Sequence, residues 1–185
     1  MKSTIPLRSL VYAALFGALT AVGAYISVPM FPVPLTLQSL FTVLAGLLLG
    51  GPVAALSQIV YVLLGVIGLP VFAGGKSGLG VLLGPTGGYL LGFILGSYVI
   101  GLIAHERKNP GVLWPLLAIV AGHVVIYGLG VLQLSLIAHL SVTKAVAVGV
   151  IPFLPGDALK SAAAILVATK VAKQWRFYGR PALHD

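Results

Sequence analysis

The sequence contains no cysteine and very few acidic residues. Only three of its 185 residues, Glu106, Asp157 and Asp185, are acidic, against eleven lysines and arginines. The absence of cysteine excludes disulfide bonds, thiolate catalysis and cysteine-based metal sites. Three scattered carboxylates also leave little material for a carboxylate metal cluster or a catalytic dyad. Charged residues form 8% of the chain, whereas a soluble domain carries roughly 25%, so the chain cannot cover a water-facing surface.

Long apolar runs take the place of the missing charge, since 59% of the residues are hydrophobic. A run that crosses a bilayer must be helical, because lipid offers the backbone no hydrogen bonds, and it needs about 20 residues. We therefore predict an all-α integral membrane protein that forms a single transmembrane domain over 1–185, with outer loops at 28–34 and 68–86 and a short interfacial helix at 143–152. The six transmembrane helices are expected at about 9–27, 35–49, 53–67, 87–104, 112–138 and 154–173.

The basic residues are unevenly divided between the two ends of these spans. With a cytoplasmic N-terminus, eight of the eleven fall on the cytoplasmic side, Lys76 and Lys144 fall outside, and Lys160 lies within the last span. This positive-inside bias predicts that both termini are cytoplasmic. Lys2 and Arg8 also resemble the start of a signal peptide, but the long run after them favours a retained span. Because the basic residues are sparse, no nucleic-acid partner is expected.

Asp157 and Lys160 are the most informative polar pair, because charged groups at membrane depth are costly. Their i, i+3 spacing places both on one face of the last helix, near its outer end. One interpretation is a self-neutralising ion pair, with the aspartate favoured by the helix N-terminus. The other is a recognition site that offers an acceptor carboxylate beside a three-donor ammonium.

Two further polar clusters are expected at the same outer level. The segment at 68–86 is rich in glycine and proline, and it is interpreted either as a pocket-lining loop or as a structural re-entrant hairpin. Its Gly75-Lys76-Ser77 resembles the end of a phosphate-binding loop. That motif requires a glycine at position 70, which is proline here, so it is rejected. Thr36 and Gln38 open the second span. Convergence of these clusters predicts an outward-facing small-molecule pocket. Its candidate residues in the glycine-rich segment are Gly74, Gly75, Lys76, Ser77, Thr86, Gly88 and Tyr89.

Other polar residues within the spans are interpreted as helix–helix hydrogen-bonding groups rather than ligand contacts. These are His123, Tyr127, Gln58 and Gln133. The first span instead carries a stripe of small residues, which either packs against the chain's own helices or meets an external helix. The stripe consists of Ala13, Ala14, Gly17, Ala18, Ala21 and Ala24.

Four motifs resemble, in order, those of the BioY biotin-transport proteins, and the resemblance covers nearly the whole chain. They are PLTLQ at 34–38, LPVFAGG at 69–75, GPTGGY at 84–89 and PGDALK at 155–160. These proteins are the substrate-binding S components of prokaryotic energy-coupling factor (ECF) vitamin transporters. The resemblance implies a six-helix S-component fold in the cytoplasmic membrane, with an outer vitamin pocket lidded by the loop after the first span.

The resemblance also implies the ligand and the partners. Biotin would contact Asp157 and Lys160, with Gln38 and the loop at 74–89 completing the pocket, and no cofactor is expected. Ala14 and Ala18 would meet the coupling membrane protein. Since the chain has no nucleotide-binding motif, ATP hydrolysis would come from two partner ATPases, and the chain itself is not expected to be an enzyme. Which charged residue meets which end of biotin, and whether the chain works alone or as a homo-oligomer, stay open.

Three other functions are weighed against this one. The chain could be an S component for another small vitamin, such as niacin, thiamine or riboflavin. A membrane scaffold without a ligand is the second alternative. An intramembrane enzyme is the least favoured, because no nucleophile, metal set or cofactor motif accompanies Asp157 and Lys160.

Overall fold

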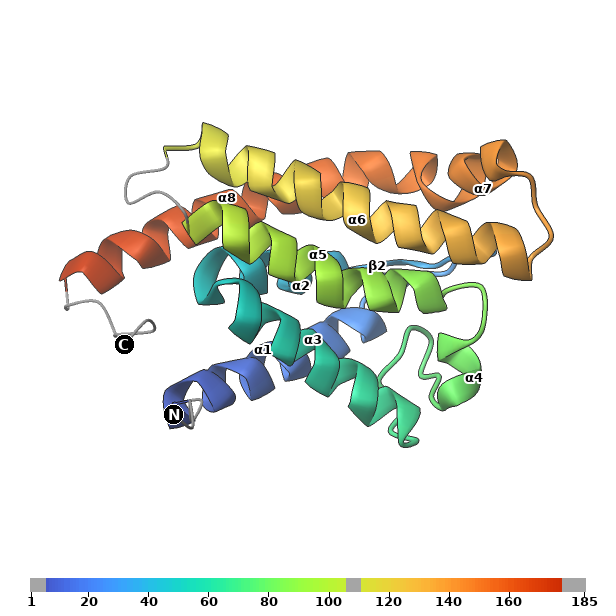
Figure 1. Cartoon of the computed structure of the whole chain (residues 1–185), viewed down its shortest axis with the longest axis horizontal. Coiled ribbons are helices and arrows are strands. Elements are labelled where there is room, and N and C mark those ends of the chain that lie inside the picture. The colour runs from blue at the N-terminus through green and yellow to red at the C-terminus, as the bar shows by residue number, and fades with distance from the viewer. Residues whose placement is uncertain (1–5, 106–110, 178–185) are drawn as a thin grey trace, which may run out of the picture.

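Helices make up most of the regular structure of the chain (Figure 1). The computed structural model describes residues 6–105 and 111–177. Among the charged residues of the chain, Lys2, Glu106, Arg107, Lys108, Arg180 and Asp185 lie outside these ranges. The helices are α1 (Leu7–Tyr25), α2 (Gln38–Leu49), α3 (Gly51–Val66), α4 (Leu79–Leu82), α5 (Gly87–His105), α6 (Leu113–Ile137), α7 (Val142–Gly149), a 3-10 turn η1 (Ile151–Phe153) and α8 (Leu154–Phe177).

Four stretches of helix within the described residues are long and apolar enough to cross a membrane: α1, α5, α6 and the α7–α8 stretch. Helices α2 and α3 are apolar but shorter, with 12 and 16 residues. They are separated by Gly50, whose φ of +80° is a backbone conformation that favours glycine. The structure therefore confirms a mostly helical membrane protein, and the count of six spans stays a prediction.

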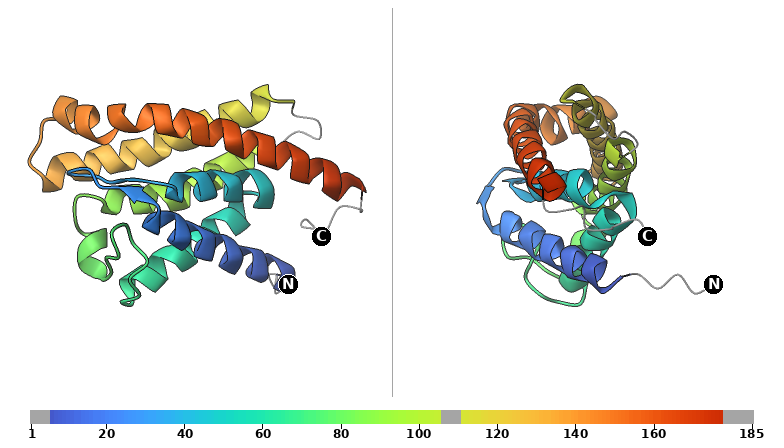
Figure 2. Two further views of the ribbon diagram at one scale, coloured as in Figure 1. Left: turned by 180° about the vertical axis from the view of Figure 1, so that it is seen from behind. Right: turned by 90° about the vertical axis from the view of Figure 1, so that its left-hand side faces the viewer.

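The helices are arranged in layers, with α1 and α3 on one side, α5 and α2 in the middle, and α6 and α8 on the other (Figures 1 and 2). The most extensive contact is between α5 and α6, whereas α6 and α8 touch each other little. The beginning of α1 and the end of α8 lie at the same end of the molecule. Helix α8 is thus held mainly through α2.

The loop after α1 is where the observed elements differ most from the predicted ones. Helix α1 ends at Tyr25, and two short antiparallel strands follow, β1 (Ser27–Val28) and β2 (Leu35–Thr36). Helix α2 then begins at Gln38 rather than at residue 35. The prolines between the strands cannot continue a helix. The two strands hydrogen bond each other, and the Leu37 N–H donates to the Gly23 carbonyl near the end of α1 at 3.1 Å.

The remaining elements lie close to their predicted positions. Helices α5 and α6 begin and end within one residue of the expected spans, and α8 continues to Phe177. The glycine-rich segment at 68–86 is irregular, as expected, apart from the single turn α4. The buried side chains form two clusters, one around Ile100 and Ile119 and one around Tyr61, Phe72 and Tyr89.

Candidate functional site

The first turns of α8 carry the only ion pair between a lysine and an acidic residue in the described part of the chain. The ammonium of Lys160 lies 2.5 Å from the Asp157 carboxylate, at i, i+3 as the spacing predicts. Both side chains are nearly buried, with 11% and 10% of their surface exposed. A buried pair of this kind is costly unless additional hydrogen bonds satisfy both partners, so the surrounding groups decide what the pair can do.

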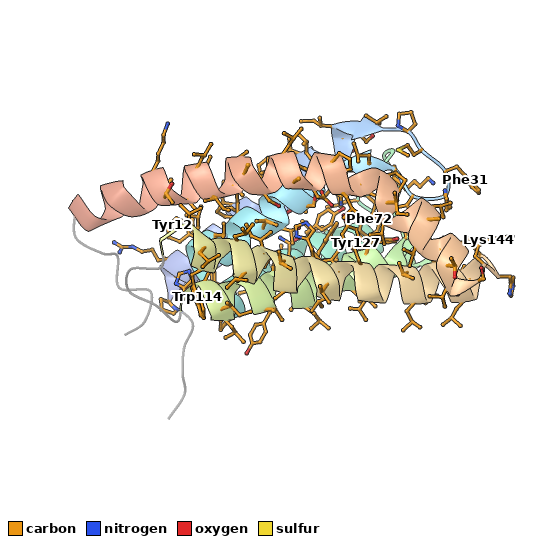
Figure 3. The ribbon with its side chains drawn as sticks, turned by 90° about the horizontal axis from the view of Figure 1, so that it is seen from above. Tyr12, Phe31, Phe72, Trp114, Tyr127 and Lys144 are labelled. Carbon is orange, nitrogen blue, oxygen red and sulfur yellow. The ribbon has the colours of Figure 1, made fainter. Side chains whose placement is uncertain are left out.

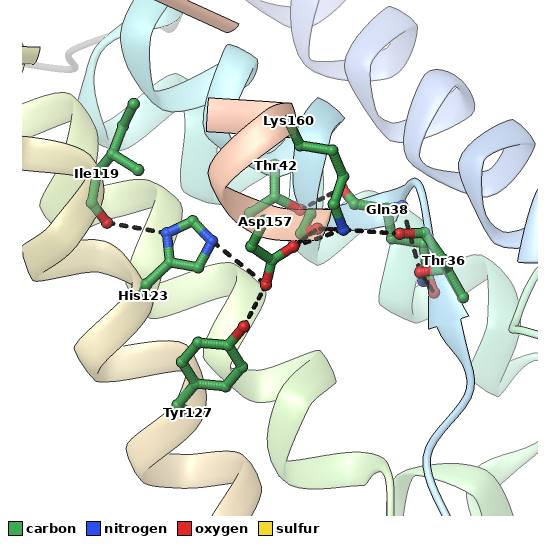
Figure 4. A network of polar contacts seen from close by, with 9 residues as sticks. Thr36, Gln38, Thr42, Ile119, His123, Tyr127, Asp157 and Lys160 are labelled. Atoms are coloured by element: carbon green, nitrogen blue, oxygen red, sulfur yellow. Dashed lines mark hydrogen bonds and ion pairs between the residues drawn. The ribbon is translucent and has the colours of Figure 1, made fainter. Parts of the chain in front are cut away.

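Helix α2 supplies part of that hydrogen bonding. The Ser39 hydroxyl donates to Asp157 Oδ1 at 2.9 Å and accepts from Lys160 Nζ at 2.6 Å. Lys160 Nζ also donates to the backbone carbonyl of Thr36 at 3.0 Å (Figure 4). An ammonium has three donors, and these three partners occupy all of them. Lys160 thus joins α8 to the strand and the helix that follow the first loop.

Helix α6 completes the surroundings of Asp157 from the opposite side (Figure 4). The Tyr127 hydroxyl donates to Asp157 Oδ2 in a short hydrogen bond. His123 Nε2 lies 3.7 Å from the same oxygen, and His123 Nδ1 lies 3.0 Å from the Ile119 carbonyl. The hydroxyl of Tyr127 therefore makes the helix–helix hydrogen bond predicted for this pair of residues, but it does so at the site itself.

Gln38 is buried at the start of α2, and its carboxamide is already hydrogen bonded on both sides. Its Nε2 donates to the Tyr61 hydroxyl at 2.5 Å, and its Oε1 accepts from the Thr36 hydroxyl at 2.9 Å. Behind it, Thr42 donates to the Gln38 carbonyl at 3.0 Å. Gln38 therefore holds β2 and α3 together at the site.

A cavity lies among these groups, between the middle of the molecule and the end that carries the β1–β2 loop. In Figure 3, Phe72 and Tyr127 lie near the middle, while Phe31 and Lys144 mark that end and Trp114 the opposite one. Apolar side chains form most of the cavity wall, among them Val33, Phe72, Leu90 and Phe93. The candidate residues that line it are Thr36, Gln38, Lys76, Thr86, Tyr89, Asp157 and Lys160.

Four of the candidate residues do not line this cavity: Gly74, Gly75, Ser77 and Gly88. Gly74 and Gly75 have φ of +72° and +70° and form the exposed tip of a turn closed by the Phe72–Lys76 bridge. Gly88 is buried, and a Cβ there would overlap the Leu129 carbonyl oxygen. Gly74 and Gly75 thus form a tight turn and Gly88 makes a close helix contact. The contact of these glycines and of Ser77 with a ligand stays a prediction.

The small-residue stripe on α1 divides between two faces. Ala13, Gly17 and Ala24 are buried against the chain's own helices, and a Cβ at Gly17 would lie 2.9 Å from the Ser57 carbonyl oxygen. Ala14 and Ala18, one turn apart, are exposed. The interpretation as packing against the chain's own helices therefore applies to the buried face, and the contact of Ala14 and Ala18 with an external helix stays a prediction.

Two glutamines expected to bond neighbouring helices do so. Gln58 donates to the Thr20 hydroxyl of α1 at 3.2 Å, which confirms the prediction. Gln133 donates to the carbonyls of Leu82 and Gly84 at 2.8 and 2.7 Å. Since Leu82 is the last residue of α4, the first of these bonds also joins two helices, and both supply a donor to carbonyls at the end of α4.

Sequence reasoning missed Ser39 as a site residue and treated His123 and Tyr127 as structural. All three contact or face Asp157. For Tyr127 and His123 a signal was present in the sequence, since their i, i+4 spacing places two polar side chains on one face of a membrane helix. Ser39 gave no comparable signal, because a single serine can satisfy itself within its own helix.

Comparison with known proteins identifies the family to which this site belongs. Residues 1–177 match the BioY family. The chain belongs to the BioY family. It is 47% identical over 167 residues to the biotin transporter BioY of Thermotoga maritima, covering 90% of this chain and 97% of that protein. It is 42% identical over 158 residues to the probable biotin transporter BioY of Pyrococcus horikoshii, covering 85% and 92%.

A solved structure shares the fold of this BioY-family chain as well. The crystal structure of an S-component for biotin from an ECF-type ABC transporter matches it with a TM-score of 0.81 and 25% identity, covering 94% of this chain and 95% of that one. Together with the apolar helices, these relatives identify a multi-pass protein of the prokaryotic inner membrane. Its named relatives are transporters rather than enzymes.

Proposed function

We propose that the chain binds biotin and is the substrate-specific subunit of an ECF-type transporter. The named activities of its relatives and of the matching S-component support this function. The observation that carries it is the buried Asp157–Lys160 pair, which opens onto a mostly apolar cavity. A mostly apolar pocket with a few convergent polar groups is what a small amphipathic ligand requires.

The cavity chemistry suits the two halves of biotin. Its ureido ring carries two N–H donors and a carbonyl, and Asp157 provides an acceptor-only carboxylate. The thioether ring and the valerate chain are apolar, and Phe72, Tyr89 and Phe93 offer aromatic surface for them. In this proposal Asp157 receives a ureido N–H, and the aromatic side chains enclose the apolar part.

The carboxylate of biotin is assigned to Lys76. All three donors of Lys160 already bond Thr36, Ser39 and Asp157. Lys76 also lines the cavity, and its ammonium has no partner within residues 6–105 and 111–177. A carboxylate that approaches this exposed cation makes a charge-assisted hydrogen bond without breaking an existing one.

The proposal includes a topology and a division of labour. We count α2 and α3 with the four longer spans, which gives six, and place both termini in the cytoplasm with the cavity facing outward. The beginning of α1 and the end of α8 lie at one end of the molecule in Figure 1, which supports both termini being on one side of the membrane. The bias of the basic residues assigns that side to the cytoplasm. Ala14 and Ala18 present an exposed face to a coupling membrane protein, and two partner ATPases supply the hydrolysis.

Titration of detergent-purified protein with biotin by calorimetry tests the function. We expect saturable binding with one biotin for each chain, retained by desthiobiotin because it keeps the ureido ring. Asp157→Asn is expected to reduce the affinity, since the amide replaces an acceptor oxygen with a donor.

Three results would contradict the proposal. Displacement of labelled biotin by niacin, thiamine or riboflavin at similar concentrations would indicate a different vitamin. The absence of any bound small molecule in mass spectra of the native protein, together with no heat of binding, would favour a scaffold. Unchanged biotin affinity in both Asp157→Ala and Lys160→Ala would show that the ligand does not bind at this pair.

A further inference from the structure

His123 contains a buried acceptor without a partner. Its Nε2 is the one buried side-chain nitrogen or oxygen in the described part of the chain that makes no hydrogen bond. Its Nδ1 lies 3.0 Å from the Ile119 carbonyl, which can only accept. The hydrogen of a neutral imidazole therefore sits on Nδ1, and Nε2 carries a lone pair.

The charge balance of the site supports the neutral imidazole. Lys160 already compensates Asp157 at 2.5 Å, and the ring beside His123 is that of the neutral Tyr127. A positive imidazole would leave a net charge in this nearly buried cluster, which is costly at membrane depth. Nε2 of His123 is thus an acceptor that faces another acceptor, Asp157 Oδ2, at 3.7 Å.

Tyr127 donates to one of these acceptors and lies beside the other. It follows His123 by one helical turn, and the two ring centroids are 5.8 Å apart. Its hydroxyl donates to Asp157 Oδ2, the oxygen that His123 Nε2 faces (Figure 4). The Tyr127 hydroxyl therefore has a second acceptor, His123 Nε2, next to the carboxylate oxygen that it uses.

The two oxygens of Asp157 differ in how readily they can take a new donor. Oδ1 accepts from the Ser39 hydroxyl and from the Lys160 ammonium, a bond strengthened by charge. Oδ2 accepts one hydrogen bond, from the neutral Tyr127 hydroxyl. A carboxylate oxygen takes two donors, so a ligand N–H can reach Oδ2 without disturbing Lys160, either beside the Tyr127 hydroxyl or in its place.

We propose that His123 Nε2 receives the Tyr127 hydroxyl when a ligand N–H takes Asp157 Oδ2. This inference rests on the proposed function and assigns His123 as a positioning residue that does not itself touch the ligand. The exchange keeps the Tyr127 hydroxyl satisfied in the bound state, so binding loses no hydrogen bond. Without the His123 acceptor, a buried hydroxyl would be left unpaired on binding, which is expensive.

A double-mutant cycle on biotin affinity tests this exchange. We expect His123→Leu to weaken biotin binding by about 5- to 10-fold, which corresponds to one lost neutral hydrogen bond. His123→Gln keeps an acceptor oxygen and is expected to restore most of the affinity. In a Tyr127→Phe background, which has no hydroxyl to transfer, His123→Leu should have no further effect.

A second measurement is made on the wild-type protein, with Tyr127→Phe as its control. In ¹⁵N-histidine-labelled protein, the His123 Nε2 resonance should shift on addition of biotin towards that of a hydrogen-bonded acceptor, and it should not do so in Tyr127→Phe. Equal losses for His123→Leu in both backgrounds, no loss in either, or an unmoved resonance would overturn the exchange. Failure of the wild-type protein to bind biotin at all would refute the proposed function as well.

Discussion

Replacement of Lys160 by methionine removes a buried cation while keeping a side chain of similar length. The variant loses three hydrogen bonds from Nζ, to Asp157 at 2.5 Å, to Ser39 at 2.6 Å and to the Thr36 carbonyl at 3.0 Å. Asp157 keeps its bonds from Ser39 and Tyr127 but loses the opposite charge. The carboxylate, with 10% of its side chain exposed, then lies at membrane depth without compensation.

The expected loss follows from this burial. Removal of one partner of a buried ion pair costs about 3–5 kcal/mol, because an unpaired charge remains. The double variant Asp157→Asn/Lys160→Met has no charge to leave unpaired, so we expect it to be more stable than Lys160→Met alone. Asp157→Asn alone leaves the Lys160 ammonium without an opposite charge, so its loss of stability should be similar to that of Lys160→Met.

Unfolding in mixed micelles by SDS, followed by tryptophan fluorescence or circular dichroism, measures these differences. All three variants are expected to lose biotin affinity, so stability and binding are compared separately. The reasoning is refuted if Lys160→Met loses less than about 1 kcal/mol, or if the double variant is as unstable as the sum of the two single variants. Either result would mean that removal of one partner does not leave an uncompensated buried charge.

The other predictions concern the cavity rim, the cavity wall and α1. Lys76→Met should bind biotin and its methyl ester with equal affinity, whereas the wild-type protein should prefer the acid. An unchanged preference in the variant would show that Lys76 does not bind the biotin carboxylate. Gly65→Ala places a Cβ inside the contact distance of the Phe72 ring in the cavity wall and should weaken biotin binding, while Gly128→Ala, with nothing within 4 Å, should not. Ala18→Leu should leave biotin binding intact but reduce uptake by the reconstituted transporter, and Ala147→Leu, at another exposed alanine, serves as its control.

The long helices could be predicted from the sequence because their signal is local. Each of α5 and α6 is a single apolar run, so composition alone places its ends within one residue. The end of α1 could not be placed in this way. Residues 27–28 and 35–36 each combine one apolar and one polar residue, and only their pairing with each other, across the intervening prolines, makes them strands.

The site was predictable in part for a related reason. Asp157 and Lys160 could be selected because charge is rare in this chain and costly in a membrane, and their i, i+3 contact is a local property of one helix. The glycines at 74 and 75 could not be placed, because a glycine that forms a turn and one that approaches a ligand look the same in a sequence. Their backbone conformation assigns them to the turn.

The sequence by itself determined the membrane environment, the long helices and the charged pair. Scarcity of charge is a property of the composition, and the spacing along one helix depends only on residues that are close in sequence. Only the tertiary structure decided which groups meet Asp157. Ser39 lies 118 positions away and Tyr127 30 positions away, so no local pattern brings them to the carboxylate. Their contact depends on how α2, α6 and α8 pack, and the same packing occupies Lys160 while leaving Lys76 unpaired within the described residues.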